Sequence, residues 1–289
     1  MKRSDDIWQR PAKLGPLRLA QKAGLCNARN MYWAWYNPRN FGDWIGPLIY
    51  EWRTGNEPYH FRPKKFNVGF GKMFFTAGSI MRKIRVDNCA TVWGSGIIHQ
   101  NDTFSRPHEI LAVRGPRTRA RCIELGYDCP PVYGDPGIIL PKIFPDTGIA
   151  TTRLGIIPHY VHLDTVRKKF LADSQIEKSV KIIDVRKPVQ EVVEQIMDCN
   201  VTVSSSLHGL IISHAYGRPS AWVTFNGDPL DGDSIKFVDY YEGTGCFDSV
   251  EPHLIDETFS MERIEQLAKL SPQPDTSKMA NRLLDVCPF

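Results

Sequence analysis

The sequence lacks long apolar runs, and its opening residues, MKRSDDIWQRPAKLG, have no apolar core of the kind that a secretory signal peptide contains. A helix needs about 20 apolar residues to cross a bilayer, so we expect no membrane-spanning segment. These two absences favour a soluble protein, and cysteines in odd number without a Cys-x-x-Cys pair favour the reducing cytoplasm. They leave open a peripheral contact with the inner face of the plasma membrane.

Cysteine is present, but it forms none of the usual patterns. The 7 cysteines are an odd number and include no Cys-x-x-Cys pair, so neither a disulfide framework nor a zinc ribbon is expected. His159 and His162 have a spacing that can suit a metal, yet no carboxylate or cysteine is patterned with them. We expect no bound metal ion.

Charge is also low and evenly spread. With 36 basic and 32 acidic residues the net charge is +4, which is too mild for a nucleic-acid-binding protein. Local arginine clusters remain available for anionic small molecules. The dinucleotide motif G-x-G-x-x-G and the phosphate-binding loop G-x-x-x-x-G-K-[ST] are both missing, so neither NAD nor ATP is indicated.

Short apolar runs alternate with helix-period segments along most of the chain, of whose residues 42% are hydrophobic. Such alternation predicts an α/β fold with parallel sheets. The strands are expected at residues 31–36, 72–80, 90–93, 111–113, 153–157, 181–185, 201–203 and 221–224. The helices are expected at residues 44–54, 116–125, 189–197, 207–216, 261–270 and 279–286.

A stretch rich in proline and glycine, residues 130–152, interrupts the alternation. It predicts a domain boundary that divides the chain into residues 1–148 and 149–289, with the terminal helices packing back on the first domain. Two α/β domains joined in this way would face a cleft. In parallel sheets, ligands bind at the carboxyl ends of the strands. The motifs described next all follow predicted strands.

Three serines, Ser204–Ser206, separate a predicted strand from a predicted helix. Ser205 or Ser206 would cap this helix, and Gly217 marks its end. His208 then lies in the first turn, where free N–H groups and the helix dipole favour an anion. A histidine at this point adds a hydrogen-bond donor, or a general acid or base. The alternative is that the serines only cap the helix and His208 is a surface residue.

Two arginines follow another predicted strand. Arg114 stands at the end of the strand, and Arg117 lies in the first turn of a helix, where the dipole disfavours a cation. A bound anion would offset that cost, and a guanidinium can hold a carboxylate or phosphate through two parallel hydrogen bonds. The alternative is a solvated basic face of the helix.

Six loops, in chain order, carry a resemblance to a known family: Asn40-Phe41-Gly42-Asp43, Trp93-Gly94-Ser95-Gly96, Val113-Arg114-Gly115-Pro116-Arg117-Thr118, Gly134-Asp135-Pro136, Pro158-His159 and Ser204-Ser205-Ser206-Leu207-His208-Gly209. They resemble the loops of the polysaccharide pyruvyl transferase family. The resemblance implies two Rossmann-like domains in a glycosyltransferase-B-like arrangement, the first on the acceptor side and the second on the donor side.

The activity that the resemblance implies is transfer of the pyruvyl group of phosphoenolpyruvate to two hydroxyls of one sugar. The product is a cyclic ketal, and the acceptor belongs to a bacterial exopolysaccharide or its lipid-linked precursor. No cofactor is implied, because phosphoenolpyruvate is itself the donor. The sequence does not indicate the oligomeric state.

The resemblance also assigns roles to residues of this chain. Proton transfer would fall to His208, His159 and Asp43, with the choice of acid and base left open. The donor would be bound by Arg114, Arg117, Ser205, Ser206, Leu207, His208 and Gly209, and the acceptor by Asn40, Gly94 and Ser95. This chain departs from many members at two positions: Ser206 stands where they carry arginine, and Gly115 where they carry aspartate.

Two other classes of function fit the same architecture. A sugar-nucleotide glycosyltransferase would need an acidic residue for the ribose and a pocket for the base, and neither is clearly patterned. A non-catalytic binding module is compatible with Ser206 in place of the commoner arginine.

Overall fold

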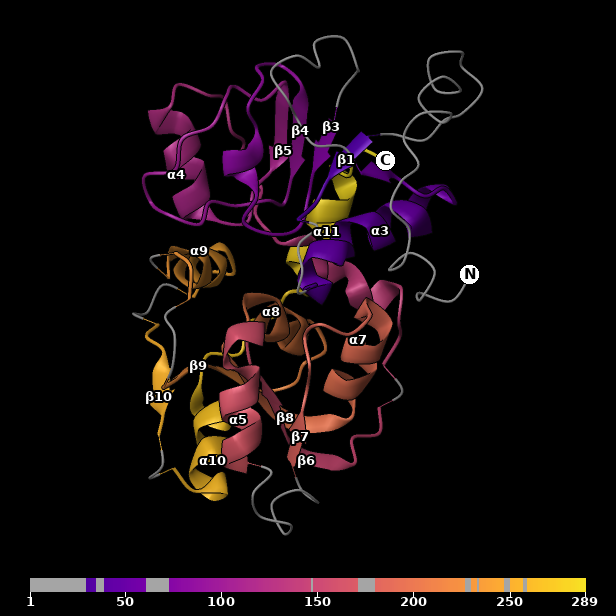
Figure 1. Ribbon diagram of the computed structural model, residues 1–289. Coiled ribbons are helices and arrows are strands. Elements are labelled where there is room, and N and C mark those ends of the chain that lie inside the picture. The colour runs from indigo at the N-terminus through magenta and orange to yellow at the C-terminus, as the bar shows by residue number, and fades with distance from the viewer. Residues whose placement is uncertain are drawn as a thin grey trace.

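The computed structural model describes residues 30–34, 39–60, 73–146, 148–170, 180–226, 230–232, 234–246, 250–256 and 259–289. Within these residues the chain forms two parallel sheets of five strands each, one above the other in Figure 1. The first sheet with its helices forms the first half of the molecule, and the second sheet with its helices forms the second half. The predicted α/β class with parallel sheets is confirmed. The glycosyltransferase-B-like arrangement and its cleft stay predictions.

The first sheet has the strand order β2-β1-β3-β4-β5. Its strands are β1 (Asn30–Tyr32), β2 (Tyr59–His60), β3 (Met73–Phe75), β4 (Ala90–Trp93) and β5 (Glu109–Ala112). The helices of this half are η1 (Phe41–Trp44), α3 (Ile45–Thr54), η2 (Met81–Lys83), α4 (Pro116–Glu124) and η3 (Pro136–Lys142). Two residues of the expected strand 31–36 and one of 72–80 lie outside the described residues.

The second sheet has the strand order β10-β9-β8-β6-β7. Its strands are β6 (Thr152–Ile157), β7 (Val180–Ile182), β8 (Cys199–Ser204), β9 (Ser220–Phe225) and β10 (His253–Ile255). Its helices are η4 (Tyr160–His162), α5 (Leu163–Phe170), α7 (Val189–Met197), α8 (Leu207–Ala215), α9 (Ile235–Gly243) and α10 (Met261–Leu270). The last helix, α11 (Ser277–Asp285), belongs to the first half in space.

Local sequence explains where these elements begin and end. In β8 the strand is buried except at its second residue, as expected for a parallel strand covered on both faces. In α4, Pro116 stands at the first turn, where a missing N–H costs nothing, and Gly126 follows with a φ of 77°. In α7, valines and isoleucine recur at helical spacing and form its buried face.

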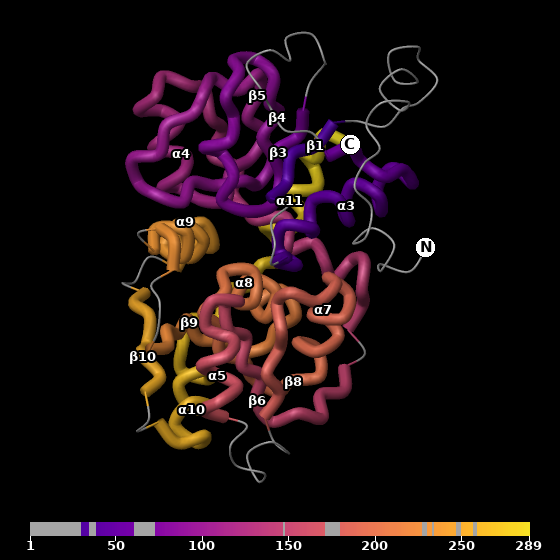
Figure 2. The backbone as a smooth tube through the Cα atoms, in the orientation of Figure 1, coloured from indigo at the N-terminus to yellow at the C-terminus, as the bar shows by residue number. Residues whose placement is uncertain are grey.

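The chain crosses back to the first half at its C-terminus, which Figure 2 shows as the yellow tube beside α3. The indole Nε1 of Trp93 donates to the carbonyl of Leu283 on α11 at 2.8 Å. The terminal Phe289 packs edge-on against Tyr50, Phe74 and Trp93. The last helix therefore closes one side of the first sheet.

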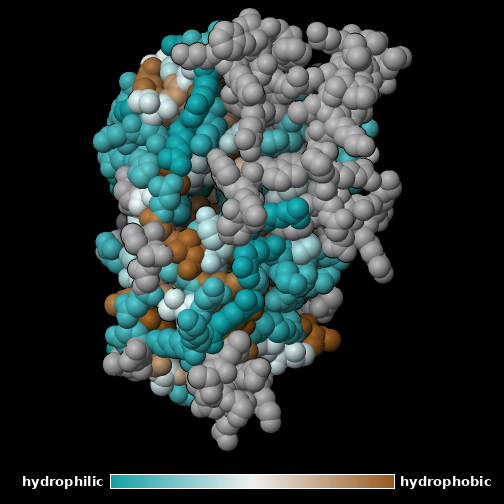
Figure 3. Space-filling view, viewed as in Figure 1, coloured by the Kyte–Doolittle hydropathy of each residue, from teal (hydrophilic) through white to brown (hydrophobic). Residues whose placement is uncertain are grey.

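The two halves share one apolar core, and each half also has a separate core of its own. The shared core joins η1, α3 and η3 to α7, α8 and α11, and it includes Ile45, Ile139, Leu210, Ile211 and Leu283. The described surface in Figure 3 is mostly hydrophilic, with some hydrophobic residues visible at the level of this junction. Among the described residues, no helix is long and apolar enough to span a membrane.

Candidate functional site

His208 lies at the junction of the two halves. It stands in the first turn of α8, and its side chain is 7% exposed. One edge of its ring faces Asp135, with Nε2 and Oδ2 3.4 Å apart, and Phe41 packs edge-on to it at a centroid distance of 6.3 Å. A Cβ on Gly42 would come within 1.9 Å of Nδ1, so only glycine at that position leaves room for the imidazole. A second-half histidine thus sits against a first-half loop.

Asp135 is the acidic residue that faces this histidine. It caps η3 by accepting a hydrogen bond from the N–H of Gly137 at 2.9 Å, and it is fully buried. Burial alone would raise its pKa, but the charge of His208, the hydrogen bond from the Gly137 N–H and the charge of Arg114 together lower it. The carboxylate therefore stays ionised beside the imidazole, although neither Asp135 Oδ2 nor His208 Nε2 has a hydrogen-bond partner among the described residues.

Asp43 approaches the same histidine from η1. The helix is capped by Asn40, whose Oδ1 accepts from the N–H of Gly42 at 3.2 Å. Burial raises the pKa of Asp43 to about 7; the charge of His208 opposes the rise and that of Asp135 adds to it. Near neutral pH this carboxyl is therefore divided between a proton-donating and a proton-accepting form.

His159 follows β6 and contacts the loop Ser204–Ser206, which is called the serine loop. Its N–H donates to Ser205 Oγ at 2.9 Å, and its ring lies 4.2 Å from that of Tyr160. Burial, with the nearby charges of Lys236 and His162, lowers the pKa of His159 to about 3. The imidazole is therefore neutral at physiological pH. Burial, followed by the charges of Asp43 and Asp231, raises the pKa of Tyr160.

The serine loop is held by its own hydroxyls. Ser204 Oγ lies 3.1 Å from the carbonyl of Ile157 and accepts from the N–H of Ser206 at 3.0 Å. Ser206 is the N-cap residue of α8, but its side chain makes no capping hydrogen bond. Gly209 is required by packing, because a Cβ there would meet Ser204 Oγ at 2.5 Å and Ile157 Cγ2 at 2.6 Å.

Arg114 is fully buried and directed across the junction to α9. Its Nε donates to Asp239 Oδ2 at 3.0 Å, its Nη1 to Ser79 Oγ at 2.8 Å and its Nη2 to the carbonyl of Ile97 at 2.7 Å. Gly115 is tightly enclosed. A Cβ on it would come within 1.8 Å of the carbonyl oxygen of Asp239. In this structure the guanidinium joins the two halves.

Arg117 makes the second connection to α9. Its Nε and Nη2 donate to the carboxylate of Glu242 at 2.6–3.0 Å, and half of its side chain is exposed. The cation in the first turn of α4 is thus compensated by a protein carboxylate. Contact of either arginine with a ligand stays a prediction.

The residues expected to bind an acceptor also have internal partners. Ser95 is fully buried, and its Oγ donates to the carbonyl of Gly78 at 2.9 Å. Gly94 has a φ of 83° and packs so closely on Pro136 and Gly134 that a Cβ would collide with both. Asn40 remains half-buried beside Asp43. Their role toward an acceptor stays a prediction.

Sequence reasoning missed the helix that carries the partners of both arginines. In α9, Asp239 is a single acidic residue in the apolar run Phe237-Val238-Asp239-Tyr240-Tyr241. Such a placement indicates a buried carboxylate that needs a cation, and this signal was available. It also missed the position of Asp135, from the Gly134-Asp135-Pro136 loop, beside His208.

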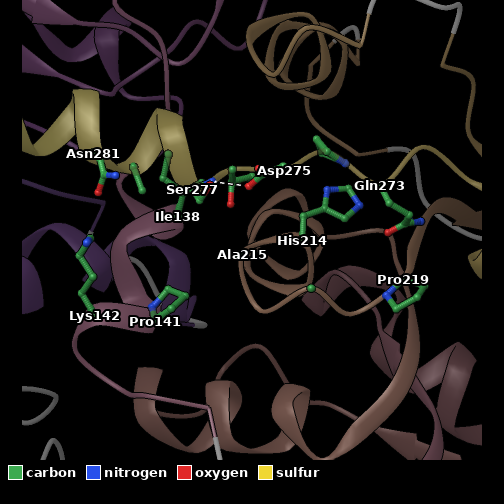
Figure 4. Close-up of a pocket in the computed structure, with 14 residues that line it drawn as sticks. Ile138, Pro141, Lys142, His214, Ala215, Pro219, Gln273, Asp275, Ser277 and Asn281 are labelled. Carbon is green, nitrogen blue, oxygen red and sulfur yellow. Dashed lines mark hydrogen bonds between the residues drawn. The ribbon is translucent and has the colours of Figure 1, made fainter. Parts of the chain in front are cut away.

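A pocket of about 620 Å³ lies at the opposite end of α8. Figure 4 shows His214 and Ala215 at its floor, with Lys142, Ser277 and Asn281 around it. It is lined by η3, α8, the chain before α11 and α11 itself, and none of the predicted site residues lines it. The candidate site around His208 is therefore separate from this pocket.

Comparison with known proteins supports the resemblance given by the loops. The sequence model of the polysaccharide pyruvyl transferase family matches residues 84–226, which hold five of the six loops, and the suspected family is thereby confirmed. An uncharacterized protein of Acanthamoeba polyphaga mimivirus is 36% identical over 178 residues, which are 60% of this chain and 60% of that protein. The chain thus aligns with about 60% of the relative's length. No solved structure matches.

Proposed function

Because residues 84–226 place the chain in the polysaccharide pyruvyl transferase family, we propose that it transfers the pyruvyl group of phosphoenolpyruvate to two hydroxyls of one sugar. The product is a cyclic ketal, and inorganic phosphate is released. The acceptor is a sugar of a bacterial exopolysaccharide or of its lipid-linked precursor, and the reaction takes place on the cytoplasmic side of the membrane.

The observation that carries this proposal is a titratable carboxyl near a buried histidine that faces a second carboxylate. Burial raises the pKa of Asp43 to about 7, and Nε2 of His208 lies 3.4 Å from Oδ2 of the ionised Asp135. Two groups with these different environments suit separate acid and base roles at neutral pH. Each such proton transfer contributes about 10²- to 10⁴-fold to the rate.

The reaction begins with protonation of the donor. Asp43 gives its proton to C3 of phosphoenolpyruvate, which becomes a methyl group, and C2 becomes electron-deficient. The first sugar hydroxyl forms a bond to C2 and loses its proton to His208. Asp135 stabilises the imidazolium that results.

The ketal forms in the second half of the reaction. The bond between C2 and the phosphate oxygen breaks, and phosphate leaves with the bonding electrons. The second hydroxyl then bonds to C2 and gives up its proton. Of the two hydroxyl protons, one replaces the proton that Asp43 gave to C3, and the other leaves with phosphate by way of His208.

The remaining site residues hold the donor rather than move protons. His159 is neutral at physiological pH, so we assign it a hydrogen-bonding role. The main-chain N–H groups of Leu207, His208 and Gly209 begin a helix whose cap residue, Ser206, gives them no side-chain bond, and they suit an anionic donor. Ser205 positions His159. Arg114 and Arg117 contribute by holding α9 in place and by their positive charge.

A direct test incubates the full chain with phosphoenolpyruvate and a panel of sugars that carry pairs of neighbouring free hydroxyls. We expect phosphate release that depends on the acceptor and is lost in His208→Gln. Turnover of a nucleotide sugar, with no phosphate release from phosphoenolpyruvate, would instead identify a glycosyltransferase and contradict the proposal.

A further inference from the structure

The pocket of about 620 Å³ at the C-terminal end of α8 has the size of a small-molecule binding site. Its lining comes from both halves of the molecule. The first half contributes η3 and α11, and the second half contributes the end of α8 and the turn that leads into β9. Residues 273–276, which precede α11, complete the lining (Figure 4). A ligand in this pocket would therefore contact elements of both halves at once.

Part of the lining is held in place by hydrogen bonds within the protein. Oε1 of Gln273 accepts from the N–H of Ser220 at 3.2 Å, and Nε2 of Gln273 donates to the carbonyl of Ser271 at 2.8 Å. The ring of His214 lies between the hydroxyl of Tyr240, 3.0 Å from Nδ1, and the carbonyl of Ser220, 3.4 Å from Nε2. A ligand need not order these side chains, so part of the entropy cost of binding is removed.

The charged side chains of the lining are of opposite sign. Lys142 brings a positive charge from η3, and Asp275 brings a negative charge from the chain before α11. Hydrogen bonds from the hydroxyl and N–H of Ser277 lower the pKa of Asp275, so its carboxylate is ionised at pH 7. Burial lowers the pKa of His214 to about 4, so its imidazole is neutral. This combination disfavours both a strongly anionic and a strongly cationic ligand.

The lining combines an apolar wall with polar side chains. Lys142 and Asn281 are exposed and lie on one side of the pocket in Figure 4, where they offer N–H donors and an amide carbonyl. The apolar wall is built from Ile138, Pro141, Ala215, Pro219 and Ala280. A sugar ring matches this mixture, because its C–H face is apolar and each of its hydroxyls both donates and accepts hydrogen bonds.

We propose that this pocket binds a neutral sugar, at a second site separate from the one around His208. Two elements connect the sites: Asp135 caps one end of η3 and Lys142 lies at the other, while His208 is in the first turn of α8 and Ala215 ends that helix. A sugar that contacts both elements stabilises the packing that brings Asp135 to His208. The acceptor of the proposed function is a ligand of this class, although the lining of the pocket alone supports the site.

The experiment titrates the full chain with glucose, galactose and mannose, without phosphoenolpyruvate, and follows binding by ligand-observed NMR and by the thermal midpoint. The variants are Asn281→Ala and Lys142→Met. The control is Asn101→Ala, because Asn101 is an exposed asparagine between β4 and β5. We expect at least one sugar to bind and to raise the thermal midpoint. Its Kd should rise about 2- to 12-fold in Asn281→Ala and about 10-fold or more in Lys142→Met, since a neutral and a charged hydrogen bond are lost. Asn101→Ala should bind as the natural chain does.

Each outcome separates the second site from the proposed function. If a sugar binds equally well to Asn281→Ala and Lys142→Met, it lies elsewhere and the second site is wrong; loss of that binding in His208→Gln would then place the sugar in the transfer site. If binding depends on Asn281 and Lys142 but the chain releases no phosphate from phosphoenolpyruvate, the second site stands and the proposed function is wrong. Binding of none of the three sugars would overturn the second site, and so would binding of inorganic phosphate in their place that is lost in Lys142→Met. Lys142 and Asn281 are both exposed, so both variants should fold as the natural chain does.

Discussion

Replacing Asp43 by asparagine should make the protein more stable while it removes activity. The carboxyl of Asp43 has an ordinary pKa of 3.8 in the unfolded chain, and burial raises it to about 7 in the folded protein. Above pH 7 the folded protein must therefore hold a charge that its surroundings disfavour. Asparagine keeps the shape of the side chain and carries no charge.

The magnitude follows from the two pKa values. Because the folded pKa is the higher one, the cost is absent below pH 3.8, grows as the pH rises and is complete above pH 7. A shift of about 3 units corresponds to about 4 kcal/mol at most. We therefore expect Asp43→Asn to raise the free energy of unfolding by up to about 4 kcal/mol at pH 8, and by about 2 kcal/mol at pH 5.

Urea-induced unfolding at pH 8 and pH 5 measures both differences. A suitable control is Asp198→Asn, because hydrogen bonds from Lys181 and Thr151 lower the pKa of Asp198, so its loss should destabilise the protein at pH 8. A decrease in stability of Asp43→Asn at pH 8 would refute the reasoning. An increase of the same size at both pH values would show that the pKa of the Asp43 carboxyl is not near 7.

Three further predictions concern the same junction. Gly42→Ala should displace the imidazole of His208 and lower kcat at least about 100-fold. The control is Gly217→Ala, which has open space around it and should lower stability without changing kcat. Steady-state kinetics and thermal melts distinguish the two variants. Arg114→Met should lower the free energy of unfolding by about 3–5 kcal/mol in urea titrations, because it leaves the buried carboxylate of Asp239 without its cation. A smaller loss would mean that the two hydrogen bonds from Thr118 are enough to stabilise that carboxylate. The kcat should fall as the pH rises through about 7, since Asp43 then loses the proton that it must donate; a rate that rises through pH 8 would exclude it as the acid.

Much of the fold could be predicted because its elements have strong local signals. The helices α7 and α10 and the strand β4 begin and end at the predicted residues, since apolar spacing and terminal residues coincide there. The strands β2 and β10 were missed, because each is short and lies at a sheet edge. The helix α9 was missed because its aromatic and β-branched residues favour a strand as much as a helix.

The site was predictable in its loops but not in its contacts. The spacing of the serines and His208 indicated a strand, a turn and a helix, and these are present. The partner of His208, however, comes from residue 135, and its position depends on how the two halves pack. Nor could the sequence show that the donors of Arg114 are taken up by Asp239 on α9. Contacts between segments this distant in sequence are decided by tertiary packing.

The proposed function is tested most directly by the product formed in D₂O. The chain is incubated in D₂O with phosphoenolpyruvate and an acceptor sugar, and the product is examined by NMR. If Asp43 protonates C3, the product is a cyclic ketal whose methyl group carries one deuterium, and phosphate is released in equal amount. A product that keeps the methylene group, as an enolpyruvyl ether would, would contradict the account. So would a panel in which no sugar gains a pyruvyl group from phosphoenolpyruvate.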